Sequence, residues 1–286
     1  MLIACVQSDV SFAAPRENLR RVLGWLEKTS DVAQNRSQSA DFIVFPECML
    51  TGYAFDSREQ AAEIALSQED PLFTEIADAL ARRDQFASIG FVESAGERLY
   101  NAAALVGPRG IESCYRKLHL PHLGVDRFVD RGDRPYRVAP LSSSRCPDVR
   151  VGLAICYDGS FPEPSRVLAL CGADVIALGT NWPDPATHTA RIVPPARSME
   201  NHVYFVAANR VGQENGFSFF GRSSICGPDG VVLAESDDNQ ETVLFAKVDP
   251  LVARNKRIER DGQAHTIDRF ADRCPEFYQK LVEPQS

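Results

Sequence analysis

The chain has 286 residues, of which 31 are Lys or Arg and 39 are Asp or Glu, so its formal net charge is −8. With 44% hydrophobic and 24% charged residues, its composition is that of a globular protein and excludes a disordered chain. The acidic balance argues against a protein that binds nucleic acid through clustered basic residues, and it gives no support to binding at a membrane surface.

The targeting and cysteine patterns point to one compartment. The N-terminal stretch MLIACVQSDV has no basic segment, and no apolar run approaches the roughly 20 residues that span a bilayer. The eight cysteines lie ten or more residues apart and form no Cys-x-x-Cys motif, so most are expected to be small buried side chains in a reducing environment. We therefore expect a cytoplasmic protein without a membrane or nucleic-acid partner.

Short apolar runs that alternate with segments of helical periodicity predict an α/β fold. In chain order, strands are predicted at residues 2–7, 41–45, 87–93, 100–106, 111–115, 149–155, 173–178, 203–208, 223–226, 231–235 and 242–248. Helices are predicted from 15 to about 29, at 71–83 and 162–171, and from about 186 to 201. The long polar stretch 117–135 is expected to be an ordered functional loop rather than a linker.

Two hairpins with similar turns suggest an internal duplication. The turns GPRG at 107–110 and GPDG at 227–230 lie about 120 residues apart, each after a strand and helix pattern. They indicate two similar α/β halves whose sheets could pack face to face; the alternative is two unrelated turns. We predict a single domain over residues 1–286, with a charged tail from about residue 251 that could pack on a neighbouring subunit.

Cys156 is the strongest candidate for a nucleophile. It follows an apolar strand and precedes a helix that opens near Pro162. Such a turn exposes the side chain, the positive helix end favours a thiolate, and backbone N–H groups can hold an oxyanion. The alternative is a structural buried cysteine. Cys48 is a rival thiol, but it lacks the strand-turn-helix context.

Two charged residues also end strands. Glu47 follows an apolar strand and Pro46, where partial burial would raise its pKa and suit it to proton transfer. Lys117 could stabilise an oxyanion or hold Glu47 and Cys156 in register. The alternatives are a capping or salt-bridged glutamate and a solvated lysine.

Other site types have weaker support. His119 and His122 are three residues apart, but Pro121 lies between them and no further ligand completes a metal site. No phosphate-binding glycine motif follows a strand, and no serine lies in a Gly-x-Ser-x-Gly turn. We therefore predict neither a metal site nor a nucleotide-binding site.

Three motifs together resemble the catalytic blocks of the nitrilase superfamily, the carbon–nitrogen hydrolases. They are FPE at 45–47, YRKLHLP at 115–121 and ICYDGSFPE at 155–163, and ARSMENHVYFVAANRVGQENG at 196–216 matches a later block. The resemblance implies an α/β fold of the four-layer α-β-β-α sandwich type, a homodimer or higher homo-oligomer, and no metal or cofactor. It also implies a Glu-Lys-Cys triad, carried here by Glu47, Lys117 and Cys156.

One position departs from the family pattern. Many members carry a second glutamate after the lysine, and this chain has Val125 there, with Asp126 next to it. Either Asp126 supplies the carboxylate or the site works without it. We expect Asp126 to point away, because a shift of one residue in an extended chain turns a side chain to the other face.

The resemblance implies hydrolysis of a small-molecule amide through a Cys156 thioester, with the backbone N–H of Tyr157 as an oxyanion donor. Tyr157-Asp158 replaces the Trp-Glu that usually follows the cysteine of true nitrilases, which favours amides over nitriles. Asn181 and Trp182 are predicted to line the pocket, unless Trp182 packs on the core. The alternatives are an N-carbamoyl amide hydrolase, a nitrilase, a soluble acyltransferase or a non-catalytic binding protein.

Overall fold

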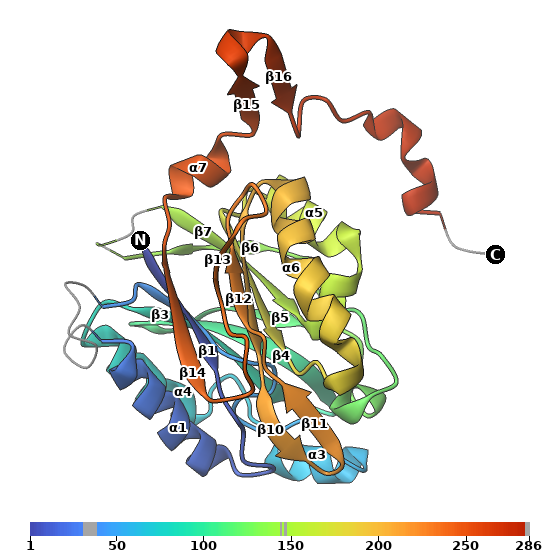
Figure 1. Ribbon diagram of the computed structural model, residues 1–286. Coiled ribbons are helices and arrows are strands. Elements are labelled where there is room, and N and C mark those ends of the chain that lie inside the picture. Colours follow the sequence, from blue (N-terminus) through green and yellow to red (C-terminus); the bar gives the residue numbers. More distant parts are fainter. Residues whose placement is uncertain (31–38, 144, 146–147, 284–286) are drawn as a thin grey trace.

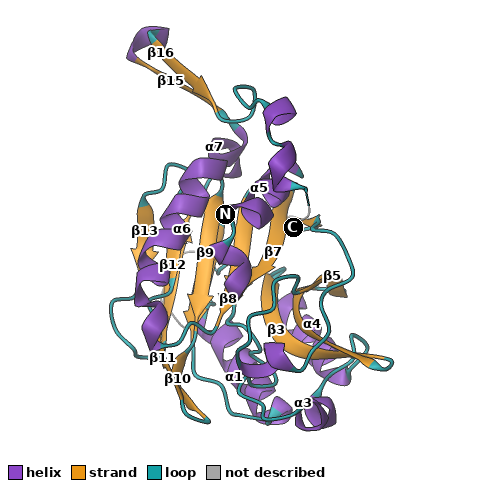
Figure 2. Cartoon of the chain, turned by 90° about the vertical axis from the view of Figure 1, so that its right-hand side faces the viewer, coloured by secondary structure: helices purple, strands orange, loops and turns teal. Residues whose placement is uncertain are grey.

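Two six-stranded sheets stack face to face and carry helices on their outer sides (Figure 1). The computed structural model describes residues 1–286 except 31–38, 144, 146–147 and 284–286, so Cys146 lies outside the described residues. Figure 2 shows the helices on the outer face of one sheet. This arrangement is the predicted four-layer α/β sandwich. Among the described residues, no helix is both long and apolar enough to cross a membrane.

The first sheet has the strand order β14-β1-β2-β3-β4-β5. Its strands are β1 (Leu2–Gln7), β2 (Phe42–Val44), β3 (Phe86–Ala95), β4 (Arg98–Gly107), β5 (Gly110–Arg116) and β14 (Thr242–Lys247). Helices α1 (Pro15–Lys28) and α4 (Pro71–Ala81) cover its outer face and contact each other. Apolar side chains at helical spacing, such as Leu19, Val22 and Leu26, pack against the sheet there.

The second sheet has the order β13-β12-β9-β8-β7-β6. Its strands are β6 (Val138–Leu141), β7 (Val149–Ile155), β8 (Val175–Thr180), β9 (Tyr204–Asn209), β12 (Ser224–Cys226) and β13 (Val232–Glu235). Helices α5 (Pro162–Leu170) and α6 (Thr187–Asn201) cover its outer face. The inner faces of the two sheets share one apolar core, and the helices cover the outer faces. Together these two layers explain the uninterrupted burial of strands β1 and β8.

The pairing of the strands supports the predicted duplication. In the first sheet, β1, β2 and β3 are parallel, and β4 and β5 follow antiparallel. In the second, β7, β8 and β9 are parallel, and β12 and β13 follow antiparallel. The two Gly-Pro turns join the same pair of strands in each half, β4 to β5 and β12 to β13.

Several elements were not predicted from the sequence. They are α3 (Arg58–Ile64), strand β6 and the hairpin of β10 (Val211–Glu214) and β11 (Phe217–Phe220). Helix α3 has only seven residues, which is too short to show a helical apolar period. Strand β6 contains Pro140 and lies at the edge of its sheet, so its residues do not follow the pattern of a buried strand.

The C-terminal segment extends away from the two sheets (Figure 1). It comprises α7 (Pro250–Arg254), the hairpin of β15 (Arg257–Arg260) and β16 (His265–Asp268), and short 3₁₀ turns at Pro275–Phe277 and Gln279–Leu281. Two of its apolar side chains are almost fully exposed, Phe277 at 80% and Val282 at 84%. The tail therefore leaves apolar surface uncovered in the single chain.

Candidate active site

Three strand ends deliver the predicted site residues to one buried region. Glu47 follows β2, Lys117 follows β5 and Cys156 follows β7, and all three side chains are buried. Glu47 and Lys117 lie close enough to Cys156 to shift its pKa in opposite directions. The structure thus brings the three residues together, while their catalytic roles stay a prediction.

The Lys117 ammonium lies between two carboxylates. Its Nζ donates to Oε1 of Glu47 at 2.7 Å and to Oδ2 of Asp126 at 2.6 Å, and the side chains of all three are inaccessible to solvent. Burial alone would lower the pKa of Lys117, but Asp126 and Glu47 raise it well above its ordinary value. The lysine is therefore a fixed positive charge at neutral pH.

The expectation that Asp126 points away from the site is wrong. Residues Gly124–Arg127 form a 3₁₀ turn rather than an extended segment, so the alternation of a strand does not apply. In this turn the Asp126 carboxylate faces Lys117, and Val125 is buried among apolar side chains instead. Burial raises the pKa of Asp126 to about 6, although Lys117 opposes that rise and Glu47 adds to it.

Asn101 and Tyr53, which the sequence analysis did not single out, hold the two carboxylates. The Nδ2 of Asn101 donates to Glu47 at 2.7 Å and to Asp126 at 2.9 Å. The Tyr53 hydroxyl donates to Asp126 at 3.2 Å. No motif marks Asn101, because it lies in the middle of β4 and looks like an ordinary strand residue.

Cys156 occupies a strained turn. Its φ of 43° lies in the left-handed region, which a residue with a side chain adopts at a cost of about 1–3 kcal/mol. Burial raises the pKa of Cys156 above its ordinary value and Glu47 raises it further, while Lys117 lowers it in part. The raised pKa favours a protonated thiol over the expected thiolate. A 3₁₀ turn at Cys156–Ser160 also separates the cysteine from the N-terminus of α5.

The segment that carries Glu47 fits between two glycines. A Cβ at Gly90 in β3 would come within 2.8 Å of the Pro46 carbonyl oxygen, and one at Gly179 in β8 within 2.9 Å of the Phe45 carbonyl oxygen. Since real Cβ atoms essentially never approach so closely, larger residues there would displace the chain around Glu47. Both glycines are thus part of what positions the carboxylate.

The predicted pocket residues differ in their surroundings. The backbone N–H of Asn181 donates to Oε2 of Glu47 at 3.0 Å, and its Nδ2 donates to the Glu47 carbonyl oxygen at 3.1 Å. Trp182 is 4% exposed and packs in the large apolar core, and its place in the pocket stays a prediction. Tyr157 is 39% exposed, and its ring meets Phe161 edge-on.

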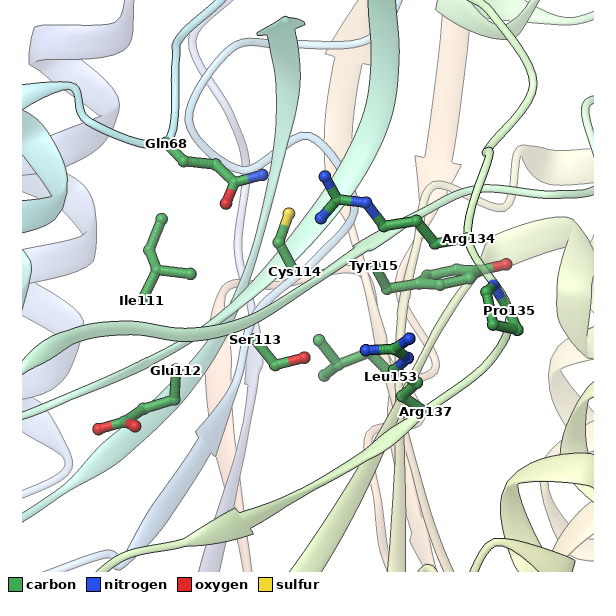
Figure 3. Close-up of a pocket in the computed structure, with 10 residues that line it drawn as sticks. All are labelled: Gln68, Ile111, Glu112, Ser113, Cys114, Tyr115, Arg134, Pro135, Arg137 and Leu153. Carbon is green, nitrogen blue, oxygen red and sulfur yellow. The ribbon is translucent and has the colours of Figure 1, made fainter.

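One cavity of the molecule lies apart from these residues. The cavity in Figure 3, of about 290 Å³, is at the edge of the sandwich beside β5 and is lined by none of Glu47, Lys117 or Cys156.

The histidine considered as a metal ligand has another partner. His119 bonds to the carboxylate of Asp158. The residues that the structure describes contain no group of three or more His, Cys, Asp or Glu side chains that could hold a metal.

Comparisons with known proteins decide the family. The family model for carbon-nitrogen hydrolases matches residues 2–257. The chain belongs to the carbon–nitrogen hydrolase family. This membership confirms the resemblance to the nitrilase superfamily, and the protein is a hydrolase of carbon–nitrogen bonds.

Individual relatives include both nitrilases and amidases. A nitrilase from Pyrococcus abyssi is 37% identical over 277 residues, which cover 96% of this chain and 98% of that protein. An (R)-stereoselective amidase from a Pseudomonas species is 34% identical over 81% of this chain and 82% of its own length. The crystal structure of an amidase from a Nesterenkonia species has the same fold, with a TM-score of 0.79 and 22% identity over 99% of this chain and 96% of that chain.

Proposed function

We propose that this carbon–nitrogen hydrolase cleaves linear amides into a carboxylic acid and ammonia or an amine, through a thioester on Cys156. The observation that carries the proposal is the buried group of Glu47, Lys117 and Asp126 against a cysteine at a strand end. A carboxylate, a fixed cation and a thiol in one water-poor site are the parts that acyl transfer needs.

In the first half of the reaction, Glu47 takes the proton of the Cys156 thiol, and the sulfur attacks the carbonyl carbon. The carbonyl π electrons move to oxygen, and the resulting oxyanion is stabilised by Lys117 and the backbone N–H of Tyr157. The oxyanion then re-forms the carbonyl, the C–N bond breaks with its electron pair on nitrogen, and Glu47 gives its proton to that nitrogen. The amine or ammonia departs and a thioester remains.

In the second half, Glu47 takes a proton from water as its oxygen attacks the thioester. The second oxyanion collapses, the C–S bond breaks, and the proton returns to the sulfur. The raised pKa of Cys156 supports this role for Glu47, because burial leaves the resting thiol protonated and so in need of a base.

Two features favour amides as substrates. Asn181 is 1% exposed, and its Oδ1 accepts no hydrogen bond from the residues that the structure describes, so it could accept one from a substrate N–H. Gly159 and Ser160 stand where N-carbamoyl-D-amino-acid hydrolases carry arginines, so this turn lacks their carboxylate clamp. A nitrile offers no N–H to Asn181.

A substrate panel tests the proposal. Short amides, N-carbamoyl amides and nitriles with the same acyl part are compared for kcat/KM by ammonia release, with Cys156→Ser protein as the control for contaminating activity. We expect the amide to be the better substrate. A preference of more than tenfold for the matching nitrile would support the second candidate, a nitrilase, which the Pyrococcus abyssi relative favours.

We also propose that the protein forms a homodimer or a higher homo-oligomer in which the C-terminal tail packs on a neighbouring subunit. The support is the exposed apolar surface of Phe277, Leu281 and Val282, which a monomer would leave in water. Light scattering of the full chain should give at least twice the mass of one chain, and removal of residues 255–286 should shift the population toward monomer. A monomeric full chain would contradict this arrangement.

A further inference from the structure

A buried carboxylate lies two residues after the nucleophile and is fully occupied as an acceptor. Asp158 is 0% exposed, and its Oδ2 accepts from the backbone N–H of Ile155 at 2.9 Å and the Tyr115 hydroxyl at 2.8 Å. Its Oδ1 accepts from Nδ1 of His119 at 2.7 Å and from the Tyr136 hydroxyl at 3.1 Å. Because an ionised carboxylate only accepts, we assign a proton to Nδ1 of His119 as the donor of this contact.

Asp158 closes the strained turn that holds Cys156. Its side chain bonds the residue before the cysteine, Ile155, and its carbonyl oxygen accepts the backbone N–H of Phe161 at 3.2 Å. Because the left-handed φ of Cys156 is unfavourable for a residue with a side chain, the turn keeps this conformation only while its surroundings hold it.

The same carboxylate holds the chain on both sides of Lys117. Tyr115 lies two residues before the lysine and His119 two residues after it, and both donate to Asp158. The Tyr115 hydroxyl also accepts the backbone N–H of Leu118 at 3.1 Å. One buried group therefore connects the lysine segment, which follows β5, to the cysteine turn, which follows β7.

His119 is fixed from a second direction. Its ring stacks on Phe161, with ring centroids 4.2 Å apart and an interplanar angle of 20°. Burial raises the pKa of Tyr115 and of Tyr136, and the neighbouring Asp158 raises both further, so these hydroxyls remain donors at all ordinary pH values. Asp158 therefore keeps its four hydrogen-bond donors, which are the backbone N–H of Ile155, the hydroxyls of Tyr115 and Tyr136, and Nδ1 of His119.

We infer that Asp158 and His119 form a positioning pair, which sets the placement of Cys156 against Lys117 without itself reacting with the substrate. The inference rests on the proposed function, because it assumes that Cys156 and Lys117 act on the same acyl group. A small misplacement of reacting groups can cost about a hundredfold in rate, so such a pair has a measurable kinetic effect.

The variants separate positioning from ordinary stability. Asp158→Asn replaces one carboxylate oxygen with an NH₂ group, which can only donate and would face the N–H and O–H groups that now donate to Asp158. His119→Ala removes the Nδ1 donor, whereas His119→Asn can place an amide N–H near it. The matched control is Asp174→Asn: Asp174 is 2% exposed and accepts from the Arg150 backbone N–H at 3.0 Å and from Arg254 at 2.8 Å, at the opposite end of strands β7 and β8.

For each variant, kcat, KM, the melting temperature and the rate at which iodoacetamide alkylates Cys156, located by peptide mass, are measured well below the melting temperature. Asp158→Asn should lower both kcat and the alkylation rate by about tenfold or more with little change in KM. His119→Ala should act in the same direction, and His119→Asn should recover most of the loss. Asp174→Asn should lower the melting temperature alone.

The inference is overturned if Asp158→Asn and His119→Ala lower the melting temperature as Asp174→Asn does but leave kcat and alkylation unchanged. If Asp158→Asn does not fold, the contrast between His119→Ala and His119→Asn decides alone. Alkylation needs no amide substrate, so a changed alkylation rate in a protein that hydrolyses no amide would sink the proposed function and leave the positioning pair standing.

Discussion

The two halves of the sandwich have the same strand pairing but different residues at corresponding strand ends. Glu47 follows β2 in the first half, and the strand registers make the neutral Thr180, at the end of β8, its counterpart in the second half. Cys156 follows β7, and its counterpart after β1 is Ser8. The duplicated fold has therefore not duplicated the site: the first half supplies the carboxylate and the cation, and the second half supplies the thiol.

The two strand ends still cooperate. Asn181, which directly follows β8, donates its backbone N–H to the Glu47 carboxylate. Gly90 in the first half and Gly179 in the second make room for the same short segment. The first half therefore contributes a buried carboxylate at a strand end, and the second half contributes packing space and a hydrogen bond around it.

The largest effect should come from the thiol of the second half. Cys156→Ala should lower kcat by about 10³-fold or more without unfolding the protein, since it removes the proposed nucleophile. Cys48 is the matched control, because it is also buried and lies beside Glu47. Cys48→Ser should keep most of the activity in an ammonia-release assay; a Cys156→Ser protein with wild-type turnover would refute the assignment.

The next effect should come from the cation of the first half. Lys117→Met should lower kcat by about 10²–10³-fold with little change in KM, because the oxyanion loses its donor and fixed charge. Lys117→Arg should rescue poorly, since a planar guanidinium does not fit a site shaped for a compact ammonium between two carboxylates. Steady-state kinetics of the two variants measure this. A kcat near the wild-type value in the folded Lys117→Met protein would mean that the lysine serves only stability.

Asp126 tests how the first half holds that cation. Asp126→Asn should lower kcat on the order of ten- to a thousandfold, as loss of a charged hydrogen-bonding partner in the site can. Asp130 is the control on the same loop: it accepts from Arg58 at 2.7 Å and from the Leu99 backbone N–H at 3.0 Å, away from Lys117. Asp130→Asn should leave kcat nearly unchanged. Equal losses of kcat in both variants would mean that the effect comes from disturbing the loop and not from the Asp126 carboxylate.

The pH dependence of the reaction gives a second test of Asp126. The pKa of Asp126 is raised to about 6, so its carboxylate gains a proton and loses its charge as the pH falls through about 6. We expect kcat/KM of the wild type to fall on that acid side, and Asp126→Asn, which cannot titrate, to have a flatter profile there. Identical acid limbs in both proteins would assign the titration to another group.

The smallest effect concerns the influence of the first half on the thiol. Glu47 raises the pKa of Cys156, so Glu47→Gln should move the midpoint of Cys156 alkylation by iodoacetamide to lower pH, even though turnover is lost with the base. The measurement is the alkylation rate against pH for both proteins. An unchanged midpoint would show that the carboxylate and the thiol do not interact.

The sequence predicted the strands and helices of both halves well, because apolar periodicity and Gly-Pro turns mark them directly. It also indicated Glu47, Lys117 and Cys156, which stand at strand ends. The direction of Asp126 was not predictable by alternation, because it depends on the 3₁₀ turn that begins at Gly124 with a positive φ of 49°.

The β10–β11 hairpin is marked in the sequence by a pair of turn residues. Asn215-Gly216 separates its strands, and both residues have the positive φ, 43° and 88°, of a type I′ hairpin turn. Its role near the site was less visible: Glu214 accepts the backbone N–H groups of Tyr53 and Ala54, a contact between residues about 160 positions apart. Local patterns cannot show such long-range bonds.

A partition experiment tests the thioester most directly. Two amides with the same acyl part and different leaving amines are hydrolysed in the presence of hydroxylamine, and the ratio of hydroxamate to acid is measured. A common Cys156 thioester predicts the same ratio from both amides, because the leaving group has departed before water or hydroxylamine attacks. A ratio that changes with the leaving amine, or acid formation without any hydroxamate, would contradict a thioester intermediate.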